Sequence, residues 1–249
     1  MDAEHAVPPT NPPAAHRPLS PTAAIGAGWR AFLARPWLSL GVTVVLMAVM
    51  CVGELVPFVN LLFAALVAPA LYAGAAWFFL CGIRGQNPTF ETAFEGFRRW
   101  SSATAALLIM IGVSMLIMIP VIGAVITTIG LTAILESKPD RFASLANAIP
   151  LPLIAAMVVT YPVLFWWSAR AHMVLFTVME PDRPGPMEAL RRSLALTRGS
   201  VWRIIGLYLL CIPVVMLGLL AACVGILPAI IVMYYAFAHA YEQLKQRAA

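Results

Sequence analysis

The stretch NPTFETAFEGFRRW, residues 87–100, decides the fold class because it runs directly into a long apolar segment. Within this stretch Phe90, Phe94 and Phe97 follow the i, i+4, i+7 spacing that places side chains on one face of a helix. Charged residues occupy the positions between them. The stretch therefore predicts a short amphipathic helix at a membrane surface, joined to a helix that crosses the membrane.

Two further segments, residues 20–37 and 185–202, repeat this arrangement. Each of the three begins with a residue followed by proline, and proline suits the first position of a helix. The pairs are Ser20-Pro21, Asn87-Pro88 and Gly185-Pro186. Serine and asparagine also cap helix N-termini well, so we expect helices to start at these points. The sequence thus predicts one unit used three times: an interfacial helix followed by a membrane hairpin.

The composition excludes a soluble globular domain. Hydrophobic residues make up 61% of the chain and charged residues only 11%. The apolar residues also form long blocks, and Trp37–Val56 alone covers ~30 Å as a helix, the thickness of the hydrocarbon core of a bilayer. The blocks predict six spanning helices, near residues 37–56, 58–83, 102–133, 149–178, 203–223 and 225–243. The predicted fold class is an all-α polytopic membrane bundle.

Positive charge sets the number of spans and their orientation, because arginine and lysine gather in cytosolic loops. Residues 102–135 are too long for one span, but a seventh helix over 124–135 would place the arginine-rich segment 183–203 outside. With six spans this segment is cytosolic, and the outside keeps Lys138 and Arg141. We therefore predict a multi-pass protein of a bacterial inner membrane with both termini cytosolic. Residues 120–148 then form a kinked helix extension and a short external excursion.

The chain divides into one membrane domain and two short tails. Proline-rich residues 1–19 predict a disordered cytosolic tail, because they can neither hold a helix nor bury a core. The domain covers 20–244, with three repeats at about 20–83, 87–180 and 184–244, and residues 245–249 form a cytosolic tail.

Short motifs along residues 21–243 resemble uncharacterised bacterial six-helix integral membrane proteins of the domain-of-unknown-function kind. The motifs are Gly28-Trp29-Arg30 with Phe32 and Pro36, Pro57 to Asn60, Pro69-Ala70-Leu71 with Gly74, Arg84-Gly85 leading to Ala93-Phe94 and Gly96-Phe97, and Ala189-Leu190 with Ser193, Leu196-Thr197-Arg198-Gly199 and Trp202. Those proteins are similar to the membrane region of some glycerophosphoryl diester phosphodiesterases. The resemblance implies an inner-membrane location and a repeated hairpin plan. The resemblance implies no enzymatic activity for this chain, because the phosphodiesterase reaction takes place in a separate soluble barrel of those proteins.

Arginines of the interfacial segments are candidates for binding lipid headgroups, since guanidinium groups attract the phosphates of anionic lipids. They are Arg98, Arg99, Arg191, Arg192 and Arg198. Two other interpretations stay open: the segments are only elbows that pack on the bundle, or they dock a soluble partner. Membrane lipids are thus the predicted partners, and we expect no binding of nucleic acid. The sequence does not specify a protein partner or a homo-oligomer.

Ionisable and hydroxyl side chains inside the spans form a second set of candidates, because polar groups at membrane depth are costly. They are Arg170 and His172 in the fourth span, and Tyr235, His239 and Glu242 in the sixth. The first two are two residues apart and therefore point to nearly opposite sides. Trp166 precedes Arg170 by one turn and is placed to stack on its guanidinium. Glu242 is expected to neutralise Arg170 or an interfacial arginine.

These patterns favour a non-enzymatic integral membrane protein that acts as a scaffold or binds lipid. The sequence offers no nucleophile–base pair, no phosphate-binding loop and no clear third or fourth ligand for a metal at His239 and Glu242, so we expect no cofactor and no metal. The alternative is a small transporter or channel in which Arg170 and His239 line a cytosol-facing cavity. A membrane enzyme that acts on lipid-soluble substrates is a third possibility.

Overall fold

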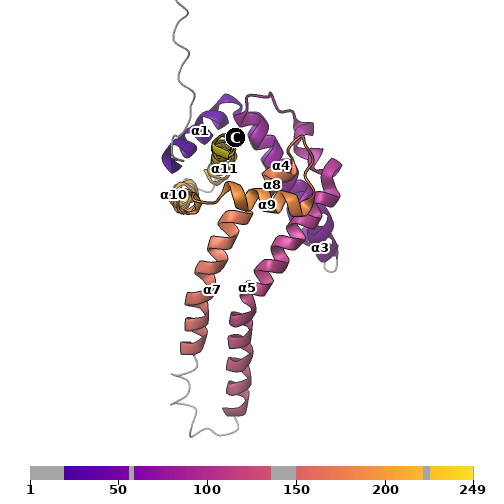
Figure 1. The fold of residues 1–249 in the computed structure, drawn as a ribbon. Helices are drawn as coiled ribbons and strands as arrows, with labels where there is room; N and C mark the ends of the chain where they lie inside the picture. Colours follow the sequence, from indigo (N-terminus) through magenta and orange to yellow (C-terminus); the bar gives the residue numbers. More distant parts are fainter. Residues whose placement is uncertain (1–19, 56–58, 136–149, 221–224, 249) are drawn as a thin grey trace, which may run out of the picture.

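The computed structural model describes residues 20–55, 59–135, 150–220 and 225–248, and this part of the chain is helical without a strand (Figure 1). The elements are α1 (Pro21–Ala34), α2 (Pro36–Leu55), α3 (Val59–Leu62), η1 (Phe63–Val67), α4 (Ala68–Ile83), η2 (Phe90–Arg99), α5 (Trp100–Leu135), α7 (Pro150–Ala171), α8 (Val174–Val178), α9 (Pro186–Leu196), α10 (Val201–Leu220) and α11 (Ile226–Ala248). The predicted tail 1–19 and the end of the predicted external excursion lie outside the described residues.

Five helical segments are long and apolar enough to cross a membrane, judged by length and composition. They are Pro36–Gly53, Asn60–Ile83, Phe90–Thr128, Leu153–Val178 and Val201–Leu220. They confirm an all-helical chain with the character of a membrane protein. The predicted sixth span, α11, is a helix but is not among the five, so the six-span layout stays a prediction.

The centre of the fold is α11, which buries one side chain after another along its length. Its largest fully buried side chains are Tyr235, Tyr241, Phe237 and Ile231. Helix α1 crosses it so closely that a Cβ atom on Gly28 would lie 2.6 Å from the carbonyl oxygen of Val232. The glycine thus permits the contact between the first interfacial helix and the core.

Small residues also bring η2 against α4. A Cβ atom on Gly74 of α4 would lie 1.9 Å from the carbonyl oxygen of Ala93, and one on Gly96 would lie 2.0 Å from the carbonyl oxygen of Ala70. Ala93 and Gly96 are accordingly the buried residues of η2. The predicted aromatic stripe is not buried in this contact, because Phe90 and Phe97 are 41% and 44% exposed.

The predicted start of this second interfacial helix was wrong by two residues. Thr89, rather than Asn87, caps η2, and Thr89 and Thr92 exchange hydrogen bonds in a capping box. Asn87 instead accepts a hydrogen bond from Arg35, which lies between α1 and α2. The other two starts are confirmed: Ser20 accepts from the backbone N–H of Ala23, and Gly185 precedes α9, which opens with proline.

Helices α5 and α7 lie side by side and extend away from the other helices (Figure 1). Helix α5 continues through Pro120 to Leu135, which agrees with the predicted extension of the third span. Its hydroxyl side chains return hydrogen bonds to helix carbonyls one turn earlier, as with Ser114 to Met110 O at 2.8 Å. The hydroxyls of Ser114, Thr127 and Thr128 are therefore satisfied without a pore, whereas that of Thr104 has no partner among the described residues.

Two predicted boundaries differ from the structure. The fourth predicted helix, 149–178, is divided into α7 and α8 by a turn at His172 and Met173. A physical reason is that the Ser193 hydroxyl donates to the Arg170 carbonyl at 2.8 Å, which takes the place of a helical hydrogen bond. Helix α11 runs to Ala248, so residues 245–248, predicted as a tail, belong to the helix.

Candidate functional site

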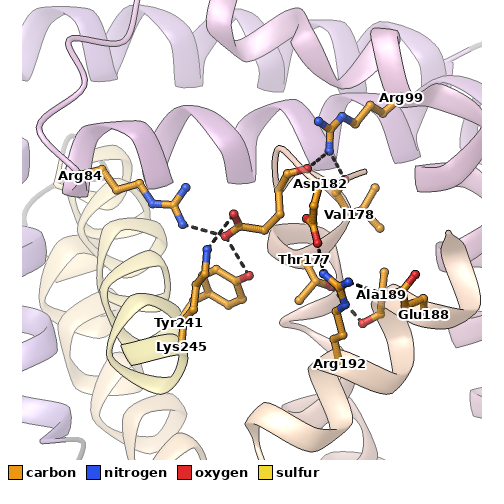
Figure 2. A network of polar contacts seen from close by, with 11 residues as sticks. Arg84, Arg99, Thr177, Val178, Asp182, Glu188, Ala189, Arg192, Tyr241 and Lys245 are labelled. Atoms are coloured by element: carbon orange, nitrogen blue, oxygen red, sulfur yellow. Dashed lines mark hydrogen bonds and ion pairs between the residues drawn. The ribbon is translucent and has the colours of Figure 1, made fainter. Parts of the chain in front are cut away.

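A buried carboxylate connects three parts of the chain: the turn after α8, the C-terminal end of α4 and the C-terminal part of α11. Glu180, in the turn after α8, is only 6% exposed. It pairs with Arg84 Nη2 at 2.7 Å and with Lys245 Nζ at 2.9 Å. Tyr241 Oη donates to it at 3.1 Å. Figure 2 shows Arg84 approaching from one side, and Tyr241 and Lys245 from α11.

Glu242 completes this ion cluster, which we define as Arg84, Glu180, Glu242 and Lys245. Its carboxylate lies 2.9 Å from Arg84 Nη2, so Arg84 bridges two acids. Burial by itself raises the pKa of the Glu180 carboxyl, but the hydrogen bonds and charges of Lys245 and Arg84 outweigh burial and hold that pKa below its ordinary value. Burial lowers the pKa of Arg84, and the two carboxylates more than reverse this effect. Glu180 and Arg84 are therefore both ionised near neutral pH.

The backbone at Glu180 positions two more arginines. Arg99 donates to the carbonyl oxygen of Val178 at 2.6 Å and to that of Glu180. The backbone N–H of Arg183 also donates to the Glu180 carbonyl, at 3.1 Å. Figure 2 shows Arg99 reaching Val178 from above the turn. Glu180 thus contacts the end of α4 and the C-terminal part of α11 through its side chain, and Arg99 and Arg183 through its carbonyl group.

Beside this turn lies a cavity of about 620 Å³ that we call the basic cavity. It is lined by Trp77, Glu95, Arg98, Arg99, Ser101, Ser102, Val178, Met179, Pro181, Arg183 and Pro184. Three guanidinium groups face one carboxylate, so its lining carries net positive charge. The cavity forms where η2 passes into α5, at the predicted level of the membrane surface.

The five predicted headgroup residues have different surroundings. Arg98 and Arg99 line the basic cavity. Arg192 forms ion pairs with Asp182 and Glu188, and these bonds raise its pKa while lowering that of Asp182 (Figure 2). Arg191 is exposed on α9, and Arg198 lines a separate cavity of about 370 Å³ near the end of α11. The structure therefore brings only the first two together.

Arg170 and His172 point to different neighbours, as their spacing predicts. Arg170 Nη2 donates to the Leu194 carbonyl at 2.8 Å, and its guanidinium lies 4.7 Å from the ring centre of Trp166. His172 instead packs among aromatic rings, with its ring centre 5.0 Å from that of Phe237. The predicted stacking of Trp166 on Arg170 is present.

The three candidates on α11 contact three different partners. Tyr235 shares a hydrogen bond of 2.9 Å with Ser39 of α2, and His239 Nε2 lies 3.0 Å from Gln243 Nε2. Glu242 binds Arg84, which directly follows α4 and lies outside the three interfacial segments, so this pairing is not one of the two expected for Glu242. Among the residues that the structure describes, no group of three or more metal-ligating side chains gathers.

Sequence reasoning missed Glu180 and did not single out Arg84 or Arg183 as site residues. Glu180 lies 96 residues from Arg84 and 61 from Tyr241, so no local spacing indicates the cluster. One signal was available: Glu180 is the acid that directly follows the apolar block 149–178. An acid at the predicted cytosolic end of a span, among many arginines, is a plausible partner for them.

Fold and site together define a helical membrane protein whose charged residues gather at helix ends. Residues 31–248 match the model of a family described as "Protein of unknown function (DUF975)", and the chain belongs to this family. The predicted membership of an uncharacterised family is thus confirmed. No curated protein and no solved structure matches the chain, and the similarity to the membrane region of glycerophosphoryl diester phosphodiesterases stays a prediction.

Proposed function

We propose that this protein is a non-enzymatic integral protein of a bacterial inner membrane that binds the phosphate headgroups of anionic lipids in the basic cavity. The observation that carries the proposal is the meeting of Arg98, Arg99 and Arg183 around one cavity at the start of a long apolar helix. A phosphate held there keeps its acyl chains beside α5, in the apolar layer.

Charge favours an anion over a zwitterion at this place. Glu95 is the single acid in the lining, against three arginines. Each basic side chain near a membrane surface contributes about 1 kcal/mol to the attraction of anionic lipid. Arginine adds forked N–H donors that match phosphate oxygens. Ser101 and Ser102 supply neutral donors in the same lining.

The backbone geometry supports a prearranged site. Arg99 is held by two carbonyl groups, so its guanidinium is fixed before a ligand arrives. Arg183 has a φ of 50°, a left-handed conformation that costs a residue with a side chain about 1 kcal/mol. This strained turn directs the chain from α8 toward α9 and leaves Arg183 at the cavity.

The test compares lipid retention by native mass spectrometry in the full-length protein. We expect the double variant Arg98→Gln with Arg183→Gln to retain phosphatidylglycerol about 30-fold less, which corresponds to about 2 kcal/mol for two cationic side chains. Retention of phosphatidylethanolamine should change little. Arg99 is left intact because it also supports the turn.

A charge-matched control combines Arg30→Gln with Arg203→Gln, which removes two exposed arginines, one of α1 and one of α10, that do not line the basic cavity. Retention of phosphatidylglycerol that stays unchanged in the double variant, or that falls equally in the control, contradicts the proposal. A loss confined to the double variant supports it. Because the anionic lipid is attracted by charge, the difference should also shrink as salt is raised.

A further inference from the structure

Another cavity lies inside the predicted membrane-spanning part, between α2, α4 and α11. Its volume is about 270 Å³. Its lining comprises Thr43, Leu46, Met47, Met50, Cys51, Leu71, Tyr72, Ala75, Phe79, Ile230 and Tyr234. On α2 this lining runs from residue 43 to 51, a distance of ~12 Å along the helix axis. Neither the basic cavity nor the ion cluster shares a residue with it.

The cavity has buried walls and an exposed mouth. Leu71 and Phe79 of α4 are 1% and 2% exposed, and the ring of Phe79 is stacked on that of Tyr234 at a centre-to-centre distance of 5.1 Å. Met47 and Tyr72 are each 43% exposed. Both lie in predicted spans, so the mouth opens toward lipid rather than toward water.

One polar atom in the wall has no partner. Thr43 is 5% exposed, and its hydroxyl makes no hydrogen bond with any residue that the structure describes. Two hydroxyls of α5 behave differently: those of Ser114 and Thr128 return hydrogen bonds to helix carbonyls. A buried hydroxyl without a partner costs free energy, which a ligand oxygen recovers.

We propose that this cavity binds a membrane-dissolved molecule with one apolar chain or ring and one hydroxyl or carbonyl oxygen, which bonds to Thr43. Ligand pockets in proteins start at about 300 Å³, so the volume suits a single chain better than a two-chain phospholipid. Methionines at the mouth adapt to chains of different shape. This ligand is distinct from the anionic headgroup proposed for the basic cavity, and the two sites are tested separately.

The experiment uses two photoactivatable probes of equal length, a diazirine fatty alcohol and the matching diazirine alkane, with the full-length protein in nanodiscs. Crosslinked peptides are located by mass spectrometry. We expect the alcohol to label the α2 segment around Met47–Cys51 at about tenfold lower concentration than the alkane, which corresponds to one net hydrogen bond. Thr43→Val should remove this difference by weakening the alcohol alone, and Thr43→Ser should keep it.

Two further variants test whether labelling depends on the hydroxyl of Thr43 in particular and on the volume of this cavity. Thr104→Val removes another buried hydroxyl without a partner, but Thr104 lies on α5 outside this cavity, so labelling should not change. Ala75→Leu fills the cavity and should abolish labelling by both probes. Equal labelling of the unmodified protein by alcohol and alkane overturns the proposal, because it indicates a groove that accepts any lipid chain. A loss in Thr104→Val equal to that in Thr43→Val overturns it as well.

Discussion

Glu180 has two cationic neighbours and almost no contact with water, so its charge is tied to the packing of three helices. Replacing it by glutamine leaves Arg84 and Lys245 without their shared carboxylate. Breaking a buried ion pair from one side typically costs about 3 kcal/mol. We therefore expect Glu180→Gln to lower the thermal unfolding midpoint in detergent clearly. Glu188→Gln is the matched control, because that acid is 55% exposed and its loss should leave the midpoint nearly unchanged.

The same carboxyl predicts how stability depends on acidity. The pKa of Glu180 is lower in the folded protein than its ordinary value of 4.5, so the folded state binds the proton less tightly than the unfolded state. The contribution of the Glu180 carboxylate to the free energy of unfolding is fully present above pH 4.5. It is lost as the pH falls through the pKa that Glu180 has in the folded protein. Unfolding midpoints measured between pH 7 and pH 3 should drop less in Glu180→Gln than in the unmodified protein. Parallel curves for the two proteins contradict this account.

At the scale of single elements, the two glycines of α1 look alike in the sequence and differ in the fold. Gly28 lies against the backbone of α11, with Val232 O 2.6 Å from the site of a Cβ atom, whereas a Cβ atom on Gly26 meets nothing within 4 Å. Gly28→Ala should therefore separate α1 from α11 and lower the unfolding midpoint. Gly26→Ala should raise stability by about 0.5–1 kcal/mol, since alanine is the better helix former. Equal effects of the two changes contradict this packing.

These elements also show where sequence reasoning ends. Local signals located the helix starts at Pro21 and Pro186 because capping depends on neighbouring residues. The start of η2 was misplaced because Thr89 and Thr92, which form the capping box, competed with an equally plausible asparagine. The ion cluster could not be predicted from the sequence, because its members become neighbours only after α4, α8 and α11 have packed together. Arg98 and Arg99, which line the basic cavity, could be named from the sequence because they lie in the interfacial segment itself, and their binding of headgroups stays a prediction.

At the scale of the whole molecule, three polar contacts each join the two ends of a predicted hairpin. Arg35 before α2 binds Asn87 after α4, and Arg99 before α5 binds the Val178 carbonyl at the end of α8. A third contact links Ser200 before α10 with Arg247 near the end of α11, at 3.3 Å. If α10 crosses the membrane, as its length and composition allow, this contact predicts that α11 returns to the same side. This geometry supports the six-span prediction although α11 is less apolar than the others.

The layout is tested by labelling single cysteines from each side of the membrane. In a variant whose four native cysteines are replaced by serine, Arg191→Cys lies in the segment predicted to be cytosolic, and Lys138→Cys lies in the predicted external excursion. A membrane-impermeant maleimide should label the first only in inverted vesicles and the second only in spheroplasts. Gln246→Cys, near the end of α11, should behave like Arg191→Cys, because the Ser200–Arg247 contact places the end of α11 beside the start of α10. Labelling of Gln246→Cys from the outside would mean that α11 does not cross the membrane, and the six-span layout would then be wrong.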